Sequence, residues 1–148
     1  EMVQIKGVDS TQRMTKADLA AGAKLIIRER LLTHGDQHAE SGFVVNLNGE
    51  DSSANVISRS VAKNNSTQVF NAEINGNAKC AGHSECDAII MDHAKISAIP
   101  KIVANDIDAA LIHEAAIGKI AGEQLIKLMT LGLTEQEAEA QIVNGFLK

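Results

Sequence analysis

The stretch that decides the fold is Phe43-Val44-Val45-Asn46-Leu47-Asn48-Gly49, in which a short apolar run ends at once in asparagine and glycine. Comparable short apolar runs recur between residues 18 and 105, and each is typical of a β-strand of a few residues. These runs are Leu25-Ile26-Ile27, Val56-Ile57, Val69-Phe70, Ile89-Ile90-Met91 and Ile102-Val103. The sequence therefore predicts many short strands.

Tight corners between the strands are indicated by eight asparagines from residue 46 to residue 77. Asparagine, like glycine, tolerates the left-handed backbone conformation that such corners require. A weak repeat is also visible: Leu47-Asn48-Gly49 and Ser53-Ala54-Asn55-Val56 resemble Ile74-Asn75-Gly76 and Asn77-Ala78-Lys79-Cys80. The offsets, from Leu47 to Ile74 and from Ser53 to Asn77, fit the coils of a β-solenoid. A β-sandwich remains the alternative.

A helical pattern is expected after His113. Apolar residues can share one helix face at Ile120, Leu125, Leu128, Met129 and Leu131, and Gly132 then provides a stop signal. Thr134 and Glu137 have the spacing of a capping box for a second helix that ends near Gly145. Helices this short are marginal alone in water, so we expect the pair to pack on the β-structure or on a partner.

The composition limits the classes of protein to which this chain can belong. A chain of 148 residues is the size of one domain, and its core must be aliphatic because Trp and Tyr are absent and there are three Phe. A net charge of −5 with no clustered Lys/Arg run argues against nucleic-acid or anionic-membrane binding. No stretch approaches the ~18 apolar residues of a membrane span, so we expect a cytoplasmic protein with reduced thiols.

Both cysteines lie close to a histidine in Cys80-Ala81-Gly82-His83-Ser84-Glu85-Cys86. Such a set of soft donors could bind zinc. In an extended strand, however, Cys80 and Cys86 would stand roughly 20 Å apart on one face, with His83 on the other. Cys86 precedes an apolar run and is best interpreted as a buried packing residue, whereas Cys80 has more polar neighbours and is the more exposed candidate.

A second histidine stands beside a carboxylate in His113-Glu114. We expect this pair at the junction between β-structure and helices. A neutral imidazole is a good iron or zinc ligand, and an adjacent carboxylate can bind the metal itself or orient the imidazole by a hydrogen bond. The alternative is a polar junction without metal. No phosphate-binding glycine loop, His-Glu-x-x-His motif or serine elbow is present, so the sequence gives no basis for an enzyme.

Several of these motifs, in this order, resemble the SufB/SufD family of SUF iron–sulfur cluster assembly scaffolds. They are Lys79-Cys80-Ala81-Gly82-His83-Ser84-Glu85-Cys86-Asp87, Ile99-Pro100, His113-Glu114-Ala115-Ala116-Ile117-Gly118-Lys119-Ile120, Glu123-Gln124-Leu125, Leu131-Gly132-Leu133-Thr134-Glu135 and Ile142-Val143-Asn144-Gly145-Phe146-Leu147. The resemblance is strong from about Gly76 onwards and covers half the chain, so we interpret the chain as a short homologue or a fragment.

The resemblance implies a mainly β protein with a right-handed parallel β-helix and a C-terminal two-helix region. Together with the helical pattern after His113, it places the β-helix core at residues 1–112, with an irregular segment at the start that ends near Ala17, and a helical docking region at residues 113–148. It also implies a SufC-like ABC ATPase docked on the helices and a dimer, with itself or with a SufB/SufD-type homologue, through the β-helix.

A transient iron–sulfur cluster is the cargo that the resemblance implies, with His113, Glu114, Cys80 and Cys86 as candidate ligands and His83 as a weaker metal candidate. The chain departs from the SufB branch in lacking a Cys between Met91 and Pro100 and in having Ile112, not Glu, before His113. Two alternatives therefore stay open: a structural interaction module without metal, and a small zinc protein that uses Cys80, His83 and Cys86.

Overall fold

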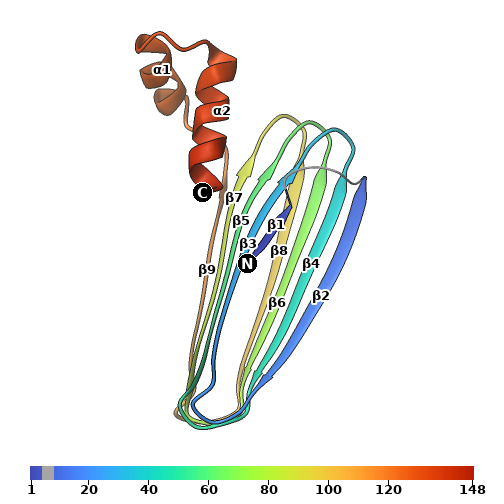
Figure 1. The fold of residues 1–148 in the computed structure, drawn as a ribbon, viewed down its shortest axis with the longest axis vertical. Helices are drawn as coiled ribbons and strands as arrows, with labels where there is room; N and C mark the ends of the chain where they lie inside the picture. Colours follow the sequence, from blue (N-terminus) through green and yellow to red (C-terminus); the bar gives the residue numbers. More distant parts are fainter. Residues whose placement is uncertain (5–8) are drawn as a thin grey trace.

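The fold is a flattened β-solenoid that carries two helices at one end (Figure 1). The computed structural model describes residues 1–4 and 9–148. The strands are β1 Met2–Gln4, β2 Ser10–Leu19, β3 Lys24–Thr33, β4 His38–Leu47, β5 Ser52–Ala62, β6 Thr67–Gly76, β7 Cys80–Ile90, β8 Lys95–Ala104 and β9 Ala110–Gly118. The helices are α1 Gly122–Thr130 and α2 Glu135–Phe146.

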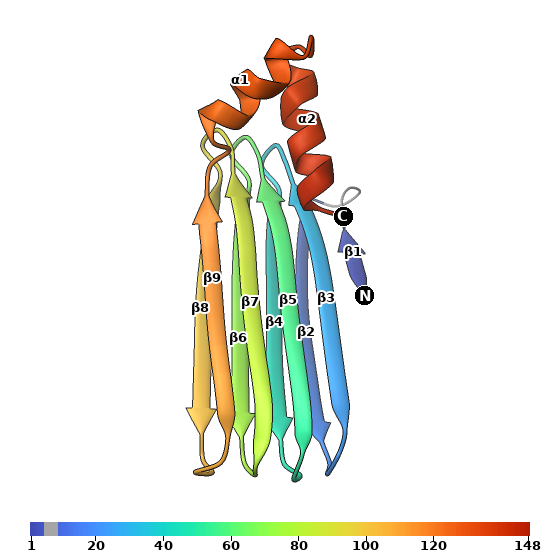
Figure 2. The same cartoon turned by 90° about the vertical axis from the view of Figure 1, so that its left-hand side faces the viewer.

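Two parallel sheets form the walls of the solenoid. One has the strand order β1-β3-β5-β7-β9 and the other the order β2-β4-β6-β8, so consecutive long strands alternate between the walls (Figure 2). Along the four-stranded wall, Ser10 pairs with His38 and His38 pairs with Thr67. The predicted solenoid is confirmed. The predicted offsets are wrong, because Leu47 pairs with Gly76 and not with Ile74.

The core is a thin apolar layer between the two walls. Strict alternation places every second residue inside, as in β6, where buried and half-buried residues alternate from end to end. Phe43 and Phe70 meet at a ring-centroid distance of 5.7 Å in an otherwise aliphatic interior. The buried cluster comprises Leu19, Ile27, Phe43, Val45, Leu47, Ala54, Val56, Phe70, Ala72, Ile74, Cys80 and Cys86.

Asparagines at the corners stack from coil to coil, as their frequency predicted. Asn77 Nδ2 donates to Asn48 Oδ1, and Asn105 Nδ2 donates to Asn77 Oδ1, both at 2.7 Å. At the opposite end of the coils, Asn64 adopts a φ of 60°. Its side-chain oxygen accepts a hydrogen bond from the Gly35 backbone N–H of the preceding coil at 3.0 Å. These contacts satisfy corner groups that would otherwise lack partners.

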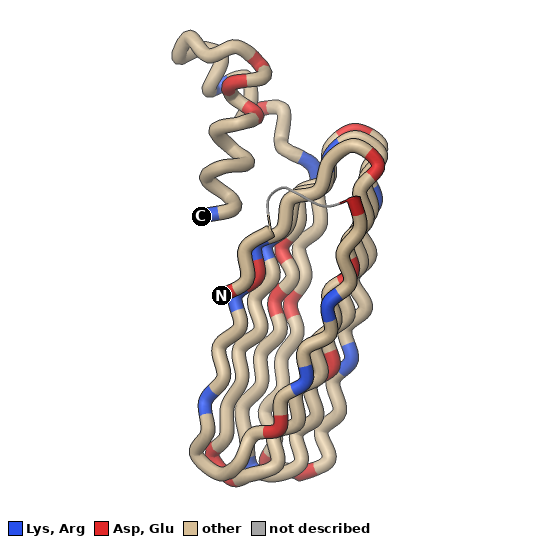
Figure 3. Tube along the Cα trace, turned by 45° about the vertical axis from the view of Figure 1, so that its right-hand side comes forward, with Lys and Arg blue, Asp and Glu red and all other residues tan. Residues whose placement is uncertain are grey.

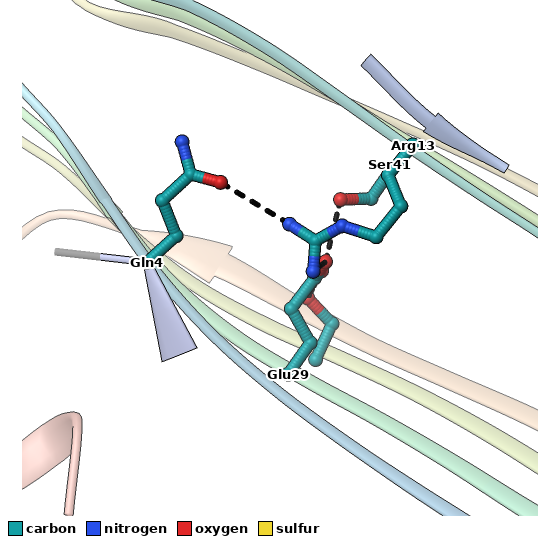
Figure 4. A network of polar contacts seen from close by, with 5 residues as sticks. Gln4, Arg13, Glu29 and Ser41 are labelled. Carbon is teal, nitrogen blue, oxygen red and sulfur yellow. Dashed lines mark hydrogen bonds and ion pairs between the residues drawn. The ribbon is translucent and has the colours of Figure 1, made fainter. Parts of the chain in front are cut away.

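A polar network lies inside the solenoid near its N-terminal edge (Figure 4). The Glu29 carboxylate is 3% exposed and accepts hydrogen bonds from the hydroxyls of Ser41 and Ser58. Arg13 Nη1 lies 4.0 Å from Glu29, and Arg13 Nη2 donates to Gln4 Oε1 at 3.2 Å. Strands from both walls supply these groups, so the buried charge is compensated where the apolar core ends.

The C-terminal helices follow the predicted pattern. The Thr134 hydroxyl accepts from the Glu137 backbone N–H, the Glu137 carboxylate accepts from the Thr134 N–H, and Gly132 adopts a φ of 96°. The capping box and the helix stop are therefore confirmed. Helix α2 packs on the outer face of the five-stranded sheet, where Val143 meets Val61 and Met91. Neither helix has the length or the apolar run needed to cross a bilayer, among the residues described.

Two expected boundaries differ from the structure. Residues 110–118 form strand β9, so the helical region begins at Gly122 and not at residue 113. Near the start of the chain, residues 2–4 and 10–19 are already strands rather than an irregular segment, and residues 5–8 lie outside the described part. The parallel pairing of β9 with β7 continues as far as Gly118, so the β-structure extends past the point at which the helical pattern was expected to begin.

Candidate functional site

The alternation of strand β7 separates its thiols from its imidazole. Cys80 and Cys86 point into the core and are 6% and 1% exposed, whereas His83 lies on the outer face. The predicted separation onto two faces is confirmed, and so is the burial of Cys86. The expected exposure of Cys80 is wrong, because this residue faces the apolar interior. The structure therefore does not bring Cys80, His83 and Cys86 together as zinc ligands.

Strand β9 likewise presents His113 and Glu114 to opposite faces. His113 pairs in register with the buried Ser84 and faces inwards, while Glu114 pairs with Glu85 and is exposed. Both residues lie in the middle of a strand and not at a junction with the helices. Within this chain, Glu114 cannot act on a ligand held by the inward-facing His113 ring.

The outer face of β7 and β9 brings together three side chains of types that can bind a metal ion. The ligand atoms of His83, Glu85 and Glu114 all lie within 4.8 Å of one another. His83 Nε2 is 3.3 Å from Glu114 Oε2, and His83 Nδ1 is 3.1 Å from Asn55 Oδ1 on β5. Acidic residues of adjacent strands lie side by side in this sheet (Figure 3). Desolvation first, and the neighbouring Asp87 second, raise the pKa of Glu85.

The inner face of the same strands holds polar groups without partners. Both ring nitrogens of His113 and the Ser84 hydroxyl are buried and have no hydrogen-bond partner among the described residues. Desolvation first, and the nearby His83 second, lower the pKa of His113 against the opposing effects of Ser84 and Glu114, which favours the neutral form of the ring at neutral pH. Burial raises the pKa of Cys86 to about 11, so this thiol is protonated at neutral pH.

Sequence reasoning missed Glu85. The signal was present, because His83 and Glu85 are two residues apart on one strand and therefore share a face. Finding the complete cluster also required the register that places Glu114 beside Glu85 on the next coil. That register depends on a coil length that the imperfect repeat did not give.

A comparison with protein families gives a match across residues 2–146 to the family described as "SUF system FeS cluster assembly, SufBD core domain". The chain belongs to the SufBD family. The matched range includes the solenoid from β1 to β9 and both C-terminal helices. The resemblance inferred from the motifs is thereby confirmed for nearly the whole chain.

Curated relatives of this SufBD chain come from archaea and bacteria. An "Iron-sulfur cluster assembly SufBD family protein" of Methanothermobacter thermautotrophicus is 35% identical over 127 residues, which cover 84% of this chain and 31% of the relative. The similarly named protein of Methanocaldococcus jannaschii is 41% identical over 105 residues, which cover 70% of this chain and 33% of the relative. A third relative, from Pyrococcus horikoshii, is 38% identical over 120 residues, which cover 80% of this chain and 27% of the relative. The SufBD chain thus spans about a third of the length of these relatives.

Proposed function

We propose that this chain is the core of a non-catalytic scaffold subunit for iron–sulfur cluster assembly. The observation that carries the proposal is the family match over residues 2–146, and the names of the relatives point the same way. The cluster is the cargo of such a scaffold and not its resident cofactor. In this function the subunit docks a SufC-like ABC ATPase and pairs with a second solenoid, either its own copy or a homologue.

His113 is the first candidate for a cluster ligand. Its ring nitrogens are neutral and unpartnered, and it stands on β9, the last strand of its sheet. A partner closing on this edge would enclose the imidazole together with Cys86, which is one strand and two residues away. Glu114 and Cys80 are weaker candidates, because the first faces the opposite side and the second lies towards the far end of β7.

Anaerobic reconstitution with iron, sulfide and the cognate ATPase tests this function. We expect a bound cluster, seen by its visible absorption, which is reduced at least tenfold in His113→Ala and unchanged in the surface control His38→Ala. A cluster that forms equally well in both variants would exclude His113 as the ligand. Failure to form any cluster, with or without the ATPase, would exclude the cluster-holding role.

An interaction module without metal is the second candidate function. One observation favours it: both thiols are buried, and burial raises the pKa of each above its ordinary value. Iron binds the thiolate form of cysteine, and burial disfavours that form for both cysteines in this conformation. This function predicts that ATPase and partner binding persist under conditions in which no cluster can form.

Helix α1 and its C-cap Leu131 supply the proposed ATPase-docking surface. None of the helix residues is buried, and Ile126, Met129 and Leu131 are 62%, 43% and 73% exposed. Because the Ile126 and Leu131 side chains are mostly exposed, Ile126→Glu combined with Leu131→Glu should abolish co-purification with the ATPase while leaving the melting temperature within about 3 °C of wild type. The control Ile26→Glu changes an equally exposed isoleucine on β3 and should retain the ATPase. Retention by the double variant would exclude docking through α1.

A further inference from the structure

The His83 ring is oriented so that one nitrogen faces a carboxylate. Asn55 Oδ1 accepts a hydrogen bond from His83 Nδ1–H at 3.1 Å, which leaves the lone pair of a neutral ring on Nε2. That nitrogen lies 3.3 Å from Glu114 Oε2. Two acceptors at this distance repel each other unless a positive charge lies between them. A proton can supply it, and so can a metal ion.

Glu85, the second carboxylate of the cluster, adds negative charge that also has to be compensated. Glu85 pairs in register with Glu114, and like charges directly opposite each other destabilise a sheet. Asp87 lies two residues further along the same face of β7 and adds a third carboxylate. Arg59 pairs in register with Asp87 and compensates one of these charges, but a single proton on His83 would still leave one carboxylate of the three without a positive partner.

The arrangement also has the shape of a metal site. Bonds of about 2.1 Å in tetrahedral geometry hold ligand atoms about 3.4 Å apart. The pair His83–Glu114 already has this spacing, and side-chain rotation of Glu85 closes the rest of the 4.8 Å spread. Metal-binding histidines usually donate their other ring N–H to an orienting acceptor, which is the position of Asn55. Glu114 is exposed and His83 and Glu85 are half-buried, so water ligands can reach an ion held between them.

We propose that His83, Glu85 and Glu114 bind one divalent first-row transition-metal ion on the outer face of the five-stranded sheet. One imidazole nitrogen with two carboxylates suits Fe²⁺, Mn²⁺, Co²⁺ or Zn²⁺, whereas Mg²⁺ and Ca²⁺ prefer oxygen ligands alone. The choice of Fe²⁺ as the natural ion rests on the proposed function, but the site itself does not. It lies on the opposite side of the sheet from Cys86 and His113.

Anaerobic titration of the whole chain with Co²⁺ and Fe²⁺ tests the site, with Co²⁺ absorption reporting nitrogen and oxygen ligands and calorimetry reporting stoichiometry. We expect one ion per chain and at least tenfold weaker binding in Glu85→Gln and in Glu114→Gln. Asn55→Ala should weaken binding by about tenfold as the loss of a positioning residue. Mg²⁺ should not compete at equal concentration.

Two controls make the outcome decisive. Glu73→Gln removes the same charge from the outer face of the other sheet, where Glu73 pairs with Lys101, and should leave binding unchanged. Cys86→Ser should also leave it unchanged, although it impairs a cluster that uses the inner face. Absence of Co²⁺ and Fe²⁺ binding, or equal binding by wild type, Glu85→Gln and Glu114→Gln, would overturn the site. Loss of binding in Cys86→Ser would assign the metal to the cluster site instead.

Discussion

At the scale of single residues, neighbours in the sequence face different environments. His113 and Glu114 share a peptide bond, yet one faces the core and the other faces solvent. The same alternation separates Cys86 from Glu85 and Asp87. The division into inner and outer residues could be predicted from the sequence for β7, because an extended strand requires it. It could not be predicted for β9, because that segment was interpreted as the end of the β-structure.

The Cys86 thiol should be unreactive. Since its pKa is about 11, roughly one thiol in a thousand is ionised at pH 8, and its 1% exposure hinders access further. In Cys80→Ser, the remaining Cys86 should react with iodoacetamide at least 100-fold more slowly than a cysteine peptide. After unfolding in guanidinium, Cys86 should react at the same rate as the cysteine peptide. Fast labelling of the folded variant would contradict the burial of this side chain.

The same shift makes stability depend on pH. The folded-state pKa of Cys86 lies above the unfolded value, so the unfolded chain loses its proton first as the pH rises. The stability that the protonated thiol contributes is therefore present below about pH 8.5 and is lost towards pH 11. Cys86→Ala should flatten this part of the stability curve, as measured by denaturant unfolding.

At the scale of elements, the corners determine how the strands stack. Asn48 stacks on Asn77, while Asn46 stacks on Asn75. The sequence repeat instead aligned Asn48-Gly49 with Asn75-Gly76, which gave an offset that was too short. Side chains on successive corners decide the alignment, and a single imperfect sequence repeat does not encode them. The helices could be predicted because capping boxes and glycine stops are local signals.

One corner glycine should tolerate no side chain. A Cβ on Gly49 would lie 2.0 Å from the backbone nitrogen of Ala21 on the preceding coil. Gly49→Ala must therefore displace the backbone of two coils, and we expect a loss of more than about 3 kcal/mol in the free energy of unfolding. Denaturant unfolding measures it.

Gly42→Ala is the matched control for this substitution. Its Cβ would clash only with the end of the Met14 side chain, which is 58% exposed and can turn away. We expect a loss below about 1 kcal/mol. Equal losses in the two variants would contradict the stacking of Gly49 on Ala21.

At the scale of the whole molecule, the solenoid is open where β8 and β9 end the two sheets (Figure 2). Ile74 is 1% exposed, but its register partner Ile102 on the last coil is 38% exposed, and Ile117 on β9 is 40% exposed. These side chains occupy positions that are core in earlier coils. Because β9 continues into α1 and not into another coil, nothing in the described chain covers them.

The open end predicts association with a second solenoid. Sedimentation velocity should show a concentration-dependent dimer, alone or with the homologous subunit, because pairing of the edges removes apolar surface and satisfies edge backbone groups. Ile102→Glu and Ile117→Lys should each shift the molecule to monomer, whereas Ile26→Lys on the outer face of β3 should not. A monomer at all concentrations, with and without the homologue, would contradict this interface.

The number of residues between register partners differs from coil to coil, and whether it is even or odd decides which residues of the next strand face inwards. The step from β5 to β7 is even and keeps even-numbered residues inside, as with Val56 and its partner Ser84. The step from β7 to β9 is odd, so it puts odd-numbered residues such as His113 there. Corners can therefore gain or lose one residue without altering either face. One residue inserted within β9 ahead of His113 would turn the His113 imidazole to the outer face, beside Glu85, and the Glu114 carboxylate to the inner face, beside Cys86.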